Sequence, residues 1–116
     1  MFNYAVILIA LGAAVGLYMA VRHFRGHTPP RGAVAALHGL LAVSGVVVLL
    51  LATRDAGMRG ALCWALGLFG IAALGGLYLA VHHMDQKRLP SPVIVVHALV
   101  AVVAFLIVLT AVYLAP

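Results

Sequence analysis

The sequence predicts an all-α fold, a bundle of four transmembrane helices that run up, down, up and down. Of the 116 residues, 66% are hydrophobic and only 8% are charged, and the mean hydropathy is +1.23. A soluble domain of this size cannot bury so much apolar surface. Four runs lack a charged residue, and each reaches the roughly 20 residues that a helix needs to cross a hydrocarbon core about 30 Å thick. These runs cover residues 1–21, 32–53, 60–84 and 89–116.

The first helix is expected over residues 3–24. A secretory signal peptide begins with basic residues and has a shorter apolar stretch. This chain begins Met-Phe-Asn-Tyr and stays apolar as far as Val21. We therefore expect a helix that is retained in the membrane.

The second helix is expected over residues 30–52, after a short loop that contains two prolines. Thr28 is its expected N-cap, because a threonine hydroxyl can accept a hydrogen bond from the first turn. Pro29 or Pro30 would then occupy that first turn, where the missing N–H is tolerated.

The third and fourth helices are expected over residues 60–84 and 92–114. The third contains Cys63, the single cysteine of the chain, which excludes a disulfide framework and argues against a cysteine-based metal site. The fourth begins with Ser91 as the expected N-cap and Pro92 after it. Because the connections that contain prolines are short, sequential helices should be antiparallel neighbours.

The distribution of basic residues predicts the orientation in the membrane. Only Arg54 and Arg59 flank the second loop, whereas five basic residues flank the first and third loops. Positive residues favour the cytoplasmic side, so both termini are expected outside the cytoplasm, most simply in a bacterial inner membrane. Topology and lipid headgroups account for the net charge of +5, and nucleic-acid binding is not expected. The five flanking residues are Arg22, Arg25, Arg31, Lys87 and Arg88.

An internal repeat divides the chain into two similar halves. The phrase GLYMAVRH at residues 16–23 returns as GLYLAVHH at residues 76–83, and each is followed by a proline loop and a second apolar helix. We expect one membrane domain, 1–116, made of two duplicated hairpins, 1–58 and 59–116, in parallel orientation. Such copies are related by a pseudo-twofold axis along the membrane normal.

Four of the six histidines occupy matched positions in the two halves. An ionisable side chain within a membrane span is costly and indicates function unless a partner satisfies it. Two members of the set lie near helix ends, and the other two lie at least one turn deeper. The remaining histidines, His27 and His82, are expected at the surface. The matched residues are His23 with His83, offset by 60 positions, and His38 with His97, offset by 59.

Small residues share helix faces with these histidines, because positions seven apart lie on nearly the same face. Gly16 and Gly76 lie seven residues before the histidines near the helix ends, and Gly45 lies seven residues after His38. Such stripes allow close helix packing, or they leave room for a flat cofactor. Haem would explain both features, because its iron takes two axial imidazoles from facing helices.

In this architecture and in these histidines, the chain resembles the four-helix transmembrane b-type cytochromes of the cytochrome b561 kind. The resemblance implies one or two haem b groups, with His23, His38, His83 and His97 as axial iron ligands and with Gly16 and Gly76 facing the haem. It also implies electron exchange with a quinone or a redox protein. That family places ligand pairs near both membrane faces, whereas all four histidines here lie toward one end, so this chain alone is not expected to carry electrons across the whole membrane.

Symmetry pairs His38 with His97 and His23 with His83, because each pair shares a depth on diagonal helices. His38 with His97 ranks first, since these residues lie deeper, where an unpaired imidazole would cost most. If one haem is bound, His23 and His83 are expected to contact its propionates or a quinone headgroup. Ligation within each hairpin is the rival arrangement. Arg31, with the other arginines at that end, is expected to pair with haem propionates.

Other functional classes fit the residues less well. A proton-coupled exporter needs a buried carboxylate, but the only acidic residues, Asp55 and Asp85, lie in or beside loops. A di-iron site needs several glutamates, and the chain has none. Two alternatives stay open: a cofactor-free subunit of a larger respiratory complex, and a protein that binds or transports a transition metal through its histidines. Assembly into a homo-oligomer also stays open, and an electron carrier is expected rather than a bond-making enzyme.

Overall fold

The computed structural model describes residues 1–57 and 60–115, which form four α-helices and a short π-helix and contain no strand. Each of these α-helices is long and apolar enough to cross a membrane, with the π-helix counted as the end of the last one. The chain is therefore an integral membrane protein. The elements are α1 (Phe2–Phe24), α2 (Gly32–Asp55), α3 (Ala61–Met84), α4 (Ser91–Leu109) and η1 (Thr110–Leu114).

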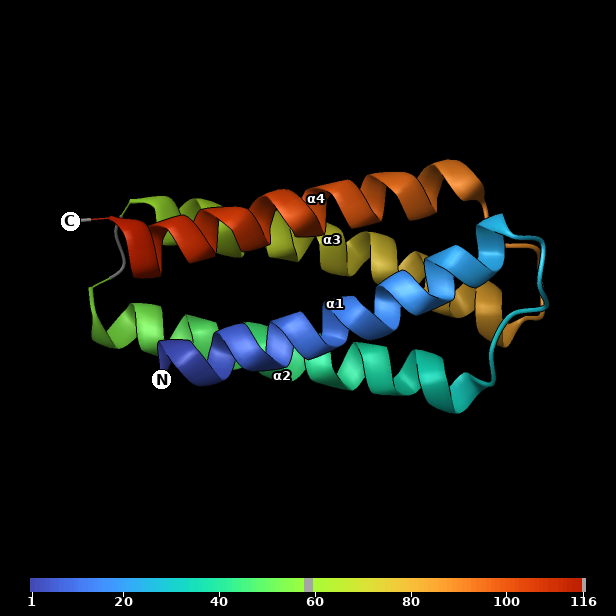
Figure 1. Cartoon of the computed structure of the whole chain (residues 1–116), viewed down its shortest axis with the longest axis horizontal. Helices are drawn as coiled ribbons and strands as arrows, with labels where there is room; N and C mark the ends of the chain where they lie inside the picture. The colour runs from blue at the N-terminus through green and yellow to red at the C-terminus, as the bar shows by residue number, and fades with distance from the viewer. Residues whose placement is uncertain (58–59, 116) are drawn as a thin grey trace.

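Each helix runs antiparallel to the one before it in the chain, as the short connections predict (Figure 1). The α1–α2 connection, residues 25–31, and the α3–α4 connection, residues 85–90, lie together at one end of the bundle, which we call the loop end. The start of α1 and the end of η1 lie at the opposite, terminal end. The molecule is 44 Å long, close to the 40–45 Å of a bilayer with its headgroups. The predicted up-down-up-down bundle is confirmed.

Two predicted helix caps are wrong. Helix α2 begins at Gly32, with Arg31 in the N-cap position and no side-chain cap, so Thr28 lies in the loop. Two consecutive prolines favour extended backbone, which delays the helix until they have passed. Helix α4 begins at Ser91 itself, after Pro90, and again has no side-chain cap. The serine hydroxyl has a different partner, described below.

The main cluster of buried hydrophobic residues lies in the terminal half of the bundle. Large apolar side chains cover the outside of the helices; Trp64 and Leu74, for example, are 76% and 70% exposed. Such exposure is expected where the surrounding solvent is lipid. The core cluster comprises Ala5, Ile9, Leu49, Ala65, Phe69, Ala104 and Val108.

Helices α1 and α2 approach each other closely at two glycines. A Cβ atom at Gly45 would lie 2.6 Å from Cγ1 and 2.9 Å from the backbone N of Ile9, and one at Gly12 would lie 3.2 Å from the backbone N of Ala42. These glycines therefore serve close helix packing. Gly45, expected among the cofactor-binding residues, instead packs against Ile9 in the hairpin interface.

The two hairpins repeat one pattern of burial. In α1, Ala5, Ile9 and Gly12 are buried; in α3, residues 65, 69 and 72 are buried at the same spacing. Packing within each hairpin is more extensive than packing between the hairpins. The predicted boundary between the copies falls at residues 58 and 59, which lie outside the described residues.

Candidate functional site

His38 from α2 and His97 from α4 lie side by side in the loop half of the bundle. Their ring centroids are 6.2 Å apart, and the ring planes are inclined by 80°. Each histidine is the seventh residue of its helix. At 1.5 Å per residue, each lies about 9 Å from the loop end of its helix and, with η1 counted as part of α4, about 25 Å from the other end. The structure thus brings together the pair that ranks first from the sequence.

Backbone carbonyls of the neighbouring helix fix the orientation of both rings. The Nδ1 of His38 lies 2.7 Å from the carbonyl oxygen of Gly12, and the Nδ1 of His97 lies 2.7 Å from that of Ala72. A carbonyl oxygen only accepts hydrogen bonds, so Nδ1 is the donor in each ring. The Nε2 of a neutral ring then carries the lone pair that a metal ligand needs. Gly12 and Ala72 are 60 residues apart, so the repeat preserves this contact.

Gly16 and Gly76 make room for the two rings. A Cβ atom at Gly16 would lie 2.8 Å from Cε1 of His38, and one at Gly76 would lie 3.1 Å from Cε1 of His97. The ring of each histidine therefore rests against the backbone of the preceding helix. These two glycines, expected to face a cofactor, face its candidate ligands in the structure.

The second expected pair is not brought together in the described residues. His23, near the end of α1, shares a hydrogen bond of 2.8 Å between its Nε2 and the Oγ of Ser91. His83 lies in the last turn of α3, and the structure has no hydrogen bond or ring contact between it and His23. The sequence around Ser91 does not indicate this role, because local spacing identifies a cap but not a partner 68 residues away.

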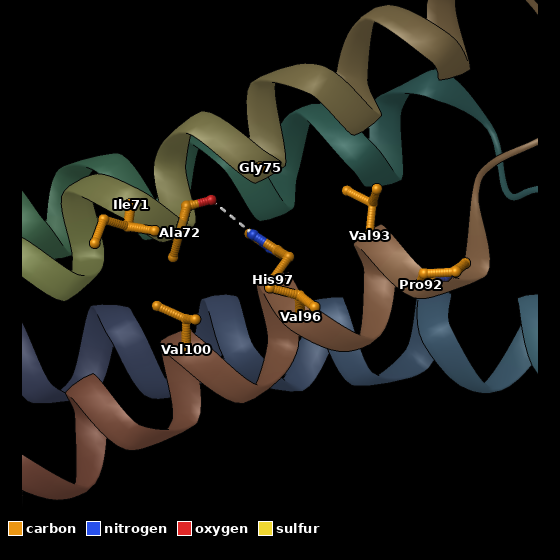
Figure 2. A pocket seen from close by; sticks show the side chains of 8 residues that line it. All are labelled: Ile71, Ala72, Gly75, Pro92, Val93, Val96, His97 and Val100. Atoms are coloured by element: carbon orange, nitrogen blue, oxygen red, sulfur yellow. Dashed lines mark hydrogen bonds between the residues drawn. The ribbon is translucent and has the colours of Figure 1, made fainter.

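An apolar groove opens beside His97, between α3 and α4 (Figure 2). Its volume is about 240 Å³, and His97 is its only ionisable residue. Ile71 and Val96 on its walls are exposed on the outside of the bundle, so the groove gives the lipid phase an approach to this histidine. Its lining residues are Ile71, Ala72, Gly75, Pro92, Val93, Val96, His97 and Val100.

Most of the basic residues lie at the loop end, the end of the bundle nearer the histidine pair. Arg31 is exposed at the start of α2. Arg22 donates from Nη2 to the carbonyl oxygen of Thr28 at 2.8 Å, and its guanidinium lies 5.8 Å from the ring centroid of Tyr18. No ion pair is found between residues of the described chain, so these cations have no carboxylate partner within it.

The described residues limit what the site can bind. Within 1–57 and 60–115, no group of three or more histidine, cysteine, aspartate or glutamate side chains gathers in one place. The four histidines therefore do not converge as a single metal site would require. What the geometry offers is one pair of imidazoles on diagonal helices, each with Nε2 as its candidate ligand atom. Comparison with protein families, curated proteins and solved structures finds no match to the chain.

Proposed function

We propose that the chain is a membrane b-type cytochrome that binds one haem b between its hairpins, with His38 and His97 as axial ligands. The observation that supports this proposal most directly is the pair of neighbouring imidazoles, each with Nδ1 bonded to a backbone carbonyl. Metal-binding histidines commonly donate their other N–H to such an acceptor, which fixes the tautomer and the ring orientation.

The distance between the His38 and His97 ring centroids fits two imidazoles that bind one metal ion. Two imidazoles that bind opposite sides of one metal ion through bonds of about 2.0 Å have ring centroids roughly 6 Å apart. The observed separation of 6.2 Å is close to this value.

The packing of the bundle supports a cofactor in the loop half. The core cluster belongs to the terminal half, and glycines rather than larger side chains lie against the two rings. Arg31 and the neighbouring basic residues lie at the same end, where they would meet the propionates of a haem.

Haem with two imidazole ligands supplies reversible one-electron transfer and has no open coordination position. The chain itself would hold the group, keep both ligands in one tautomer and exclude water with its apolar helices. We place the protein in a bacterial inner membrane with both termini outside the cytoplasm, because the loop end carries most of the positive charge. Its redox partner would be a quinone or a redox protein.

Absorption spectra test the proposal directly. Membranes that contain the wild-type chain, expressed with added haem precursor, should show a Soret band and a pyridine haemochrome of haem b. His38→Ala and His97→Ala should each lose the low-spin spectrum. His82→Ala is a matched control, because that Nδ1 bonds only the carbonyl oxygen of Tyr78 in its own helix. Wild-type protein that is well folded and binds no haem would refute the proposal and favour a cofactor-free subunit; uptake of zinc or copper alone would favour a metal-binding protein.

A further inference from the structure

We propose that His23 and Ser91 form a clasp that sets the separation of the two hairpins at the loop end, and with it the spacing of the His38 and His97 rings. The clasp joins the last turn of α1 to the first residue of α4 through a partly buried hydrogen bond of 2.8 Å. Its consequence for haem ligation rests on the proposed function, whereas its effect on ring spacing does not. His23 is thereby assigned a positioning role in place of an axial ligand role.

The clasp is the side-chain hydrogen bond that joins the two hairpins at the loop end of the described chain. In the described residues, two side-chain hydrogen bonds join the hairpins: the clasp at the loop end, and the bond from the Tyr113 hydroxyl to Asn3 Oδ1 at the terminal end. The terminal end is also held by the hydrophobic core. The loop half has no comparable core cluster in the described chain, so the clasp carries more of its alignment.

The clasp connects the two helices that position the candidate ligands. Helix α1 provides the Gly12 carbonyl that orients His38, and the same helix ends beside His23, eleven residues later. Helix α4 begins at Ser91 and carries His97 six residues further on, a rise of about 9 Å. Because both helices are continuous between these points, a shift at the clasp is transmitted to the separation of the two rings.

The repeat does not duplicate the clasp. The residue equivalent to His23 is His83, offset by 60. The residue equivalent to Ser91 is Gly32, offset by 59 like His38 and His97, and each is the first residue of its helix. Glycine has no side-chain hydroxyl, so His83 has no equivalent partner there. At the loop end, a side-chain hydrogen bond therefore joins α1 to α4, and no equivalent bond joins α3 to α2 in the described chain. Loss of the Ser91 hydroxyl would leave the two hairpins without a side-chain hydrogen bond at this end.

Distance measurements on the full-length protein without haem, in lipid nanodiscs, test the clasp itself. Nitroxide labels would replace Leu40 and Leu99, each two residues beyond a candidate ligand and exposed by 67% and 60%, in a Cys63→Ala background. Ser91→Ala and His23→Ala should each lengthen and broaden the distance distribution, and the double variant should change it no further, because one contact is lost in all three. Ser91→Thr, which keeps the hydroxyl, should restore the wild-type distribution.

Thr110→Ala is the matched control, because the Thr110 hydroxyl bonds the Leu106 carbonyl within the same helical segment. It should leave the distribution unchanged. Distributions for Ser91→Ala that match wild type would overturn the clasp, as would additive effects of the two single variants.

Haem titration of the same variants tests the consequence for ligation. In the Ser91→Ala variant, loss of one hydrogen bond should weaken haem binding about two- to tenfold and alter the low-spin electron paramagnetic resonance signal of the haem. The Ser91→Thr variant should match wild type in both measurements. A changed distance with unchanged haem affinity and signal would overturn the positioning role. If wild type takes up no haem, the proposed function fails, and the distance distributions alone decide the clasp: broadening supports it and identity with wild type overturns it.

Discussion

Gly16→Ala is a sharp test of how the histidine pair is held. The new Cβ atom would lie 2.8 Å from Cε1 and 3.0 Å from Nδ1 of His38, whereas ordinary contact begins near 3.4 Å. The ring must therefore retreat from α1 by about 0.6 Å. Retreat also draws Nδ1 away from the Gly12 carbonyl, which it contacts at 2.7 Å. The His38 side chain has only two rotatable bonds, χ1 and χ2, so the ring has few other ways to move away from the new methyl group.

The expected loss follows from overpacking. Inserting a methyl group into a well-packed site costs about 1–3 kcal/mol, and part of that loss is the weakened hydrogen bond, worth about 0.5–1.5 kcal/mol. Under the proposed function, Gly16→Ala should weaken haem binding by roughly 5- to 150-fold, since 1.4 kcal/mol is a factor of about ten. Gly76→Ala should lose less, because its Cβ would lie 3.1 Å from Cε1 of His97 and a retreat of about 0.3 Å suffices.

The order of haem affinities among these variants can be measured by haem titration, with the Soret absorbance as the readout. Gly39→Ala is the matched control, because it adjoins His38 on α2 and its Cβ would meet nothing within 4 Å. Alanine in a helix interior is favoured over glycine by up to about 1 kcal/mol, so Gly39→Ala should bind haem as wild type does. Equal affinities for Gly16→Ala and Gly39→Ala would refute the argument that the ring rests on the α1 backbone.

Three further predictions test the fold. Gly45→Ala should destabilise the first hairpin by about 1–3 kcal/mol in thermal unfolding, because its Cβ would meet the Ile9 backbone N at 2.9 Å; an unchanged midpoint would contradict the close crossing. Leu49→Ala, at a fully buried site, should cost about 2–5 kcal/mol through the cavity it leaves, whereas exposed Leu50→Ala should change stability little. Single cysteines at Arg25 and Lys87, in a Cys63→Ala background, should react with an impermeant thiol reagent from the same side of the membrane; labelling from opposite sides would contradict the shared loop end.

Much of the fold is predictable because the membrane imposes it. Lipid demands long uncharged helices, so the charge-free runs locate the helices to within three residues when η1 is counted with α4. Short proline-containing loops then require antiparallel neighbours. The offsets between matched histidines predict which pair shares a depth, and His38 and His97 are indeed adjacent.

The remaining errors concern contacts between distant segments. On a single helix, a stripe of small residues has the same sequence pattern whether it faces a cofactor or a neighbouring helix. The pattern therefore predicts that Gly45 faces a cofactor, whereas Ile9 lies against it in the structure. Ser91 has the local spacing of an N-cap, but its hydroxyl bonds His23 on another hairpin. Gly12 and Ala72 were identifiable as members of the small stripes, yet nothing in the spacing indicates that their carbonyls orient the rings.

The duplication explains why the candidate site needs both halves of the chain. Each hairpin supplies one imidazole together with the carbonyl that orients it, His38 with Gly12 and His97 with Ala72. One hairpin therefore offers a single candidate ligand, whereas the proposed haem centre would require two. Joining two copies in parallel orientation places the second ligand at the same depth. The copies then differ at Ser91, whose counterpart in the first hairpin is Gly32. Only the second hairpin therefore has a hydroxyl at this position, and the contact proposed to set the ring spacing breaks the symmetry of the two copies.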